Sequence, residues 1–244
     1  MSGRASRHPS GRRPRPALPP DQLTIVWQSA SLLLDYPDEQ TLARAGLLRD
    51  ASHRLPAALG DSIRAFLDHL EVTPLADLQA DYVETFDTRR RCNLFLTYFA
   101  HGDTRKRGMA LLRFKQVYLG AGFELDDAEL PDHLCVVLEF AATVDHALGR
   151  DLMLDHRAGL ELLRLSLQDL ASPWASLVDA VTATLPPLDG DERDAVRRLA
   201  AEGPPEEEVG LAPFAAPRFS PGAVSTGAPE TALLPMPSFP GARR

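Results

Sequence analysis

Apolar residues recur every three or four positions from about residue 21 to residue 201, which is the spacing of one face of an α-helix. No run in this region alternates apolar and polar residues between hairpin turns, as a half-buried β-strand would. With 244 residues and 44% hydrophobic content, the chain can bury one substantial core. We therefore predict an all-α fold, a single helical bundle formed by residues 21–201.

The two ends differ in composition from this middle region. Residues 1–20 contain five Arg and five Pro, and residues 202–244 contain nine Pro and five Gly. Such segments lack the apolar periodicity of a packed core, so we expect a disordered basic arm at 1–20 and a disordered Pro/Gly-rich tail at 202–244. Prolines follow Arg12-Arg13 where a twin-arginine signal has an apolar run, so we expect no signal peptide.

Charge and hydropathy exclude two classes of partner. A net charge of −8 is unfavourable for a protein body that binds nucleic acid, because phosphate requires a clustered cationic surface. No run approaches the roughly eighteen apolar residues that cross a bilayer. We expect a cytoplasmic protein without direct membrane insertion, in which Cys92 and Cys135 are small buried side chains and form no disulfide.

The segment from residue 75 to residue 87 places an aromatic face beside an acidic one. Leu75, Leu78, Tyr82 and Phe86 recur at three or four residues and share one face of a helix. Another face carries three carboxylates, those of Asp77, Asp81 and Glu84. A core face and a solvated face explain this pattern, but an acidic strip beside aromatic side chains also suits a basic amphipathic peptide.

A break in the helical pattern at residues 101–103, His-Gly-Asp, precedes a cationic helix start. The glycine can form a turn, and Asp103 can cap the next helix. The cations of residues 105–107 fill its first turn, where the helix dipole disfavours positive charge. Local stability does not explain them. They either form salt bridges, to Asp103, Asp87 or a distant carboxylate, or anchor a partner.

The following helix is predicted to begin at residues 130–132, Leu-Pro-Asp, because proline and aspartate both favour a first turn. His133 lies beside this start, where an imidazole can orient a loop or change charge near neutral pH. Asp132, Glu139 and His146 would share one face of this helix. One helix rarely encloses an ion, and the chain has no HExxH or CxxC motif, so we expect no metal site.

Together, the polar signatures of residues 82–140 resemble those of the delta-subunit chaperones of respiratory nitrate reductase, the NarJ group within the TorD/DmsD superfamily. Residues 82–86 are similar to that superfamily's Y-x-x-L-F motif, and residues 131–133 to its E-P-x-D-H motif, which borders the groove for a client's leader peptide. Thr85 replaces the leucine and Leu130 stands near the glutamate position, which favours the nitrate reductase branch.

The resemblance implies a chaperone rather than an enzyme. Its partner would be the N-terminal segment of the nitrate reductase alpha subunit. The alpha–beta complex and cofactor-biosynthesis proteins would be further partners, and the chaperone would not be part of the final enzyme. The molybdenum bis-guanine-dinucleotide cofactor would be the client's cargo, and the chain would bind no cofactor tightly. Helix-in-groove recognition would use apolar anchors and charges. The residues assigned to client-peptide binding are Tyr82, Phe86, Asp87, His101, Asp103, Arg107, Leu112, Asp132, His133, Leu134 and Glu139.

Two other functions stay open. The nearer is a chaperone of the same superfamily that serves another molybdoenzyme, which titration with candidate leader peptides would distinguish. The farther is a metal-dependent helical enzyme, which elemental analysis would support by finding a stoichiometric ion. The chain has no GxSxG, no P-loop and no Cys/His dyad at informative spacing, so a binding protein is the leading class.

Overall fold

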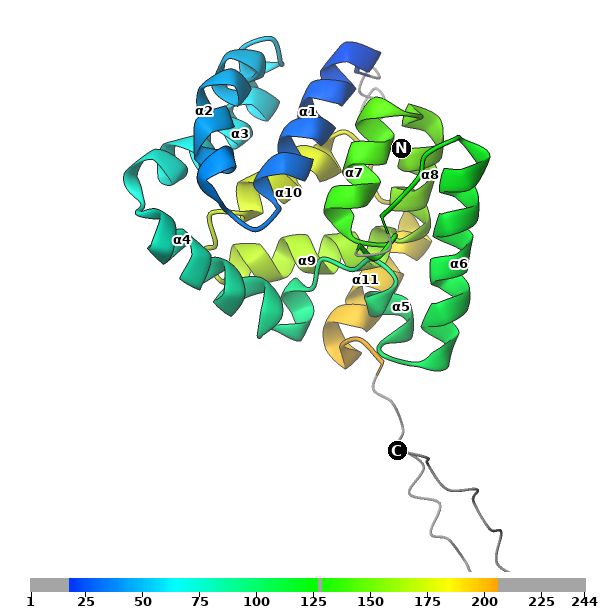
Figure 1. Ribbon diagram of the computed structural model, residues 1–244. Helices are drawn as coiled ribbons and strands as arrows, with labels where there is room; N and C mark the ends of the chain where they lie inside the picture. Colours follow the sequence, from blue (N-terminus) through cyan, green and yellow to red (C-terminus); the bar gives the residue numbers. More distant parts are fainter. Residues whose placement is uncertain (1–17, 127–128, 206–244) are drawn as a thin grey trace, which may run out of the picture. The chain divides into compact units, whose positions relative to one another are not determined.

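The computed structural model describes residues 18–126 and 129–205, and within these ranges it is all-α, as predicted. A π-helical turn, η1 (Val83–Asp87), continues α4, and a 3₁₀ turn, η2 (Arg90–Cys92), follows it. The α-helices of the described residues, shown in Figure 1, are α1 (Pro20–Leu33), α2 (Glu39–Ser52), α3 (Ala57–Val72), α4 (Leu75–Tyr82), α5 (Tyr98–His101), α6 (Arg105–Gly120), α7 (Leu134–Thr143), α8 (His146–Asp155), α9 (Arg157–Asp169), α10 (Ala175–Ala183) and α11 (Gly190–Glu202). The predicted arm and tail lie mostly outside the described residues.

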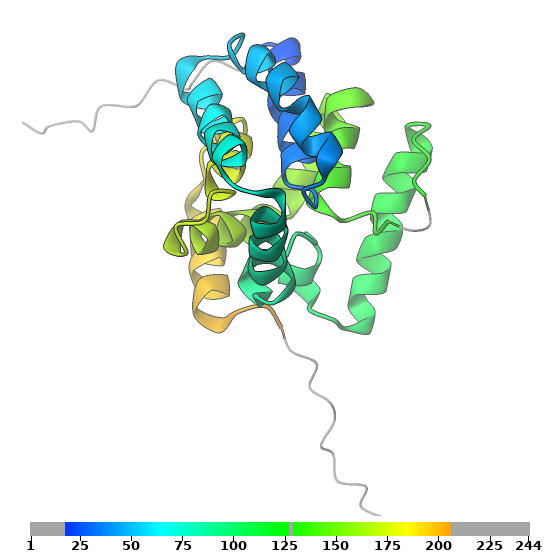
Figure 2. The same ribbon diagram turned by 60° about the vertical axis from the view of Figure 1, so that its left-hand side comes forward.

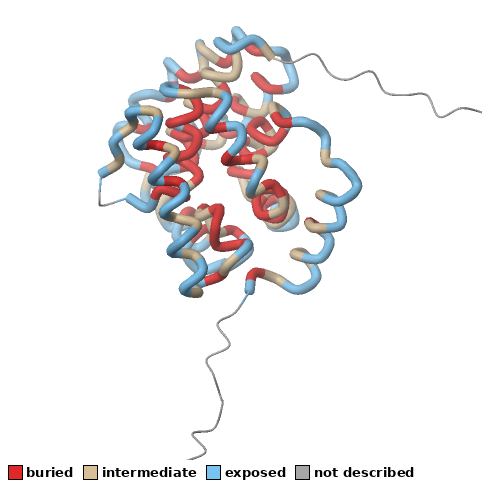
Figure 3. The backbone as a smooth tube through the Cα atoms, turned by 90° about the vertical axis from the view of Figure 1, so that its right-hand side faces the viewer, coloured by how far each residue is buried: buried red, intermediate tan, exposed pale blue. Residues whose placement is uncertain are grey.

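Helix α1 has a central place in the packing. It contacts α7, α10 and α2, while α3 packs against α10 and α2, and α9 packs against α11 and α10. Figure 2 shows α6 at the right-hand edge, away from α2, α3 and α4. Buried stretches gather inside the bundle in Figure 3. One core thus joins helices from both ends of the described sequence.

Trp174, just before α10, is the centre of an aromatic cluster. Its ring lies 5.6 Å from that of Phe66, 5.8 Å from that of Tyr82 and 5.5 Å from that of Phe86. Leu78, Tyr82 and Phe86 are buried and Leu75 is partly buried, so the predicted apolar face points into the core. The neighbouring carboxylates are exposed, and the Glu84 carboxylate pairs with Arg89 at 2.7 Å.

One predicted helix start and one predicted helix cap are wrong, whereas α6 begins at Arg105, so residues 105–107 fill its first turn as predicted. Helix α7 begins at Leu134 rather than at residues 130–132, because the preceding residues pair with another loop, as described below. The N-cap residue of α6 is Thr104, without a side-chain capping bond, whereas the Asp103 carboxylate contacts the Arg107 guanidinium at 3.3 Å. In both places the observed structure is determined by contacts between side chains or loops, and not by the helix-start preferences of the local sequence.

The two cysteines are free and buried, as predicted. Within the described ranges, no helix is long and apolar enough to cross a bilayer.

Substituting alanine for either of two helical glycines should change the stability of the protein in opposite directions. A Cβ at Gly149 would overlap Ala141, where α8 crosses α7, whereas a Cβ at Gly46 in α2 meets nothing within 4 Å. We expect Gly149→Ala to lower the free energy of unfolding by about 1–3 kcal/mol through overpacking. Gly46→Ala should raise it by up to about 1 kcal/mol through helix propensity. Urea denaturation measures both, and equal effects would contradict the packing of α7 on α8.

Candidate functional site

A buried carboxylate joins the loop before α7 to the segment before α5. Asp132 is fully buried, and its Oδ2 accepts hydrogen bonds from the backbone N–H of Thr97 at 3.1 Å and from the Thr97 hydroxyl at 2.5 Å. The guanidinium of Arg107 lies 3.5 Å from the same oxygen and also donates to the Thr97 hydroxyl at 3.2 Å. For Arg107, the salt-bridge explanation of the cationic helix start is therefore correct.

Backbone contacts hold the same two segments together. Leu96 N–H donates to the Asp132 carbonyl at 3.0 Å, and Leu134 N–H donates to the Leu94 carbonyl at 2.8 Å, around an antiparallel bridge between Phe95 and His133. The Tyr118 hydroxyl of α6 donates to the Pro131 carbonyl at 2.7 Å. These bonds explain why residues 130–133 do not join the helix.

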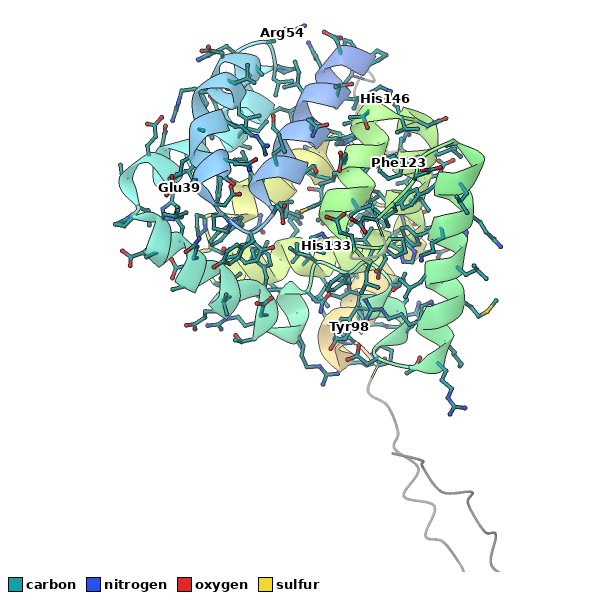
Figure 4. The ribbon with its side chains drawn as sticks, viewed as in Figure 1. Glu39, Arg54, Tyr98, Phe123, His133 and His146 are labelled. Atoms are coloured by element: carbon teal, nitrogen blue, oxygen red, sulfur yellow. The ribbon has the colours of Figure 1, made fainter. Side chains whose placement is uncertain are left out.

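The ring of Phe95 is held by a cation and by an imidazole. The Arg107 guanidinium carbon lies 5.2 Å from its centroid, within cation–π range. The His133 ring lies 5.0 Å away, edge to face. His133 is labelled at the lower end of α7 in Figure 4. Phe95 therefore has a defined orientation although it is only partly buried.

Phe95 and His133 line a surface cavity of about 330 Å³, which we call the acidic hollow. Apolar side chains and two carboxylates form its wall. Its lining residues are Asp35, Phe95, Glu129, Leu130, His133 and Val136. They come from the α1–α2 loop, the segment before α5 and the entry to α7, so three distant parts of the sequence build it.

Negative charge concentrates at the acidic hollow. Partial burial, and then the neighbouring carboxylates of Asp35, Glu139 and Asp126, raise the pKa of Glu129. Burial lowers the pKa of His133, against the smaller effect of Asp35 and Asp132, which favours a neutral imidazole near pH 7. The hollow is thus suited to an apolar segment that carries a cation.

Tyr82 supports the wall formed by the α1–α2 loop. Its hydroxyl donates to the Leu34 carbonyl at 3.1 Å, and the half-exposed ring of Tyr36 packs edge-on against its ring at 5.5 Å. Asp35 lies between these two contacts in sequence. Tyr82 can therefore position Asp35 without meeting a peptide itself.

The structure separates the predicted binding residues into groups. Tyr82, Phe86 and Leu134 are buried packing residues, and Asp132 is buried beneath the hollow. His133 lines the hollow, and Glu139 lies close enough to raise the pKa of Glu129. Arg107, at the start of α6, contacts Asp132 and the ring of Phe95. The remaining residues fall elsewhere: Asp103 exposed before α6, His101 at the end of α5, Asp87 exposed on η1, and Leu112 on the outer face of α6.

Five residues that line the hollow are absent from the predicted binding set: Asp35, Phe95, Glu129, Leu130 and Val136. Phe95 stands in an apolar stretch of sequence, residues 94–99, which is typical of a core segment, and Asp35 lies about one hundred positions from His133. The turn after Asp35 was the available signal, since a polar residue between two helices is exposed on a loop. Within the described residues, no group of three His, Cys, Asp or Glu side chains is arranged to hold a metal ion.

Comparison with known proteins identifies the family. The family model described as "Nitrate reductase delta subunit" matches residues 52–179, more than half of the chain. The chain belongs to the nitrate reductase delta subunit family. The resemblance based on residues 82–140 is thereby confirmed at the level of the family.

Relatives in this family include two kinds of protein. The Bacillus subtilis "Probable nitrate reductase molybdenum cofactor assembly chaperone NarJ" is 32% identical over 169 residues, 66% of this chain and 88% of that protein. The Escherichia coli K12 chaperone NarJ is 34% identical over 161 residues, 65% and 66% of the two chains. The Mycobacterium tuberculosis H37Rv "Nitrate reductase-like protein NarX" is 38% identical over 164 residues, 67% of this chain, which spans only 25% of that longer protein.

One solved structure is similar to much of this chain. It is a "Putative Redox Enzyme Maturation Protein" from Archaeoglobus fulgidus, 20% identical, with a TM-score of 0.49, covering 71% of this chain and 97% of that one.

Asp132 and Asp103 contact the same arginine, but we expect their substitution to lower the free energy of unfolding by very different amounts. Asp132→Ala leaves Arg107 and the Thr97 N–H without their buried acceptor and should cost about 3–5 kcal/mol of unfolding free energy. Asp103 contacts the same guanidinium, but its side chain is 75% exposed, so Asp103→Ala should cost less than about 1 kcal/mol. Chemical denaturation measures both, and similar losses would contradict the burial of Asp132.

The histidines predict lower stability in acid. Burial lowers the folded-state pKa of both His133 and His156, so below about pH 6.5 the unfolded state takes up protons that the folded state does not. The free energy of unfolding should therefore fall as the pH falls from about 7 through this window. His156→Gln should reduce the slope, measured by urea denaturation at several pH values. An unchanged slope would show that His156 titrates equally in both states.

Proposed function

We propose that this chain is a cytoplasmic assembly chaperone for a nitrate reductase, and that its acidic hollow binds the N-terminal segment of the catalytic alpha subunit. Membership of the delta subunit family supports the chaperone role, because its relatives from Bacillus subtilis and Escherichia coli are named as molybdenum cofactor assembly chaperones of nitrate reductase. The choice of binding surface rests on the acidic hollow.

The chemistry of the hollow fits a short segment with an apolar residue beside a cation. Phe95, Leu130 and Val136 provide apolar contact, and Leu130 is 43% exposed before any partner binds. Asp35 and Glu129 would meet the cation and fix the register of the bound segment. The framework beneath, with Asp132 and Tyr82, keeps these side chains in place before binding, which lowers the entropic cost of association.

Binding would delay assembly of the client. A chaperone that occupies the N-terminal segment would hold the alpha subunit open until the molybdenum bis-guanine-dinucleotide cofactor is inserted, and only then allow docking to the membrane anchor. The cofactor is cargo for the client in this scheme. The chaperone would contact the alpha–beta complex and cofactor-biosynthesis proteins during this interval and would leave before the enzyme is complete.

A charge-reversal series tests the binding surface. We expect Asp35→Lys and Glu129→Lys each to weaken binding of a peptide from the alpha subunit N-terminus at least tenfold, about 1.4 kcal/mol, in calorimetric titration. Asp77→Lys and Asp81→Lys introduce the same charge on the exposed face of α4 and serve as matched controls. Equal losses in all four variants would indicate a general charge effect and contradict a local site.

Competing peptides decide which client is served. The leader segment of nitrate reductase should bind at least tenfold more tightly than those of other molybdoenzymes from the same organism, about 1.4 kcal/mol. If the leader peptide of another molybdoenzyme bound most tightly, that enzyme would be the client instead of nitrate reductase, and the proposed chaperone role would remain.

A further inference from the structure

Helix α6 exposes apolar side chains on the face that points away from the protein. Only Phe114 and Tyr118 of its residues are buried. Met109 is 71% exposed, Leu112 46% and Leu119 69%, and α6 lies at the right-hand edge in Figures 1 and 2. At 100° per residue these three side chains fall opposite Phe114. The acidic hollow does not use them.

The exposed face has the spacing of a coiled-coil contact. Arg105, Met109, Leu112, Gln116 and Leu119 follow one another at steps of four, three, four and three, and we call them the α6 seam. The α6 seam is about 20 Å long at 1.5 Å per residue. Its width is one side chain, which suits a single partner helix more than the plane of a lipid bilayer.

Cations flank the α6 seam on both sides. Lys106 and Arg113 follow seam positions, and Lys115 precedes one, so they occupy the places that form ion pairs between the helices of a coiled coil. All three are exposed. The whole helix carries five cations and no carboxylate in a chain of net charge −8. Arg113 contacts Asp155 at 2.6 Å, but both side chains are largely exposed and such a pair is weak.

The flanking charges select the partner. A second copy of α6 would place cations against cations, which opposes pairing of this helix with itself. An anionic lipid surface would meet the cations of α6 but also the net negative charge of the rest of the chain. A helix with acidic residues beside a leucine-type seam matches both the spacing and the charge.

We infer that the α6 seam binds one helix of another protein, and that this helix carries apolar residues at its own seam positions with Asp or Glu at the flanking positions. The surface is separate from the acidic hollow. Two heptads give a small contact, so the complex is transient, with an affinity on the order of micromolar. Gln116, the uncharged polar member in the middle of the seam, would fix the register of the partner.

A pair of synthetic helices tests the inference on the full-length protein. The first probe has about three heptads with Leu at both seam positions and Glu at both flanking positions, and the second has Lys in place of Glu. Fluorescence anisotropy should show the Glu probe binding at least tenfold more tightly than the Lys probe, with the difference shrinking at high salt. Lys106→Glu should weaken binding of the Glu probe.

Substitutions in the seam locate the contact. Met109→Glu and Leu112→Glu should each weaken binding of the Glu probe at least tenfold, while Leu47→Glu, on a leucine of α2 that is as exposed as Met109, should not. Because these side chains are exposed, thermal melts should show all three variants folded. Affinity for the client peptide should be unchanged in Met109→Glu, so failure here and failure of the proposed function are distinguishable.

Several outcomes would overturn the inference. Two of them concern the probes: equal affinity for the Glu and Lys probes, and unchanged affinity for the Glu probe in Leu112→Glu. The other two are binding of the wild-type chain to phosphatidylglycerol vesicles and dimerisation of the wild-type chain, if Leu112→Glu abolishes either one. The vesicle result would assign the α6 seam to a membrane, and the dimer result to a second copy of the chain.

Discussion

The buried carboxylate of Asp132 is the constraint on which the site depends. Removing a charge from water is costly, and here the cost is offset by two hydrogen bonds from Thr97 and by the guanidinium of Arg107. Those contacts fix the loop before α7 against the segment before α5. The same arginine lies over Phe95, whose other neighbour is His133. One buried charge therefore orients both aromatic residues of the acidic hollow.

This arrangement changes what the family's polar signatures do. Tyr82 and Asp132 are buried, and they hold the α1–α2 loop and the loop before α7, which both contribute to the hollow. The side chains that a client would meet lie outside these signatures or beside them, namely Asp35, Glu129 and Leu130. Loss of binding after substitution of Asp132 would therefore reflect a displaced loop, which is why the charge-reversal variants avoid the buried framework.

The sequence predicted what depends on local periodicity. The all-α class and the buried face of Leu78, Tyr82 and Phe86 follow from helical spacing alone. The start of α7 could not be predicted in this way, because pairing of Phe95 with His133 prevents residues 130–133 from forming a helix. Asp35 could not be assigned for the same physical reason: the turn after it indicates only that it is exposed, whereas its place beside Glu129 results from the packing of α1 against α7.

The central proposal is that this chain is needed to load molybdenum cofactor into the nitrate reductase of its own host. The most direct test deletes the chain in that host and measures molybdenum per alpha subunit in purified nitrate reductase, with complementation by the wild-type chain as the control. We predict alpha subunit that is present but lacks molybdenum and activity, both restored by complementation. Nitrate reductase with a full complement of molybdenum and normal activity in the deletion strain would contradict the account.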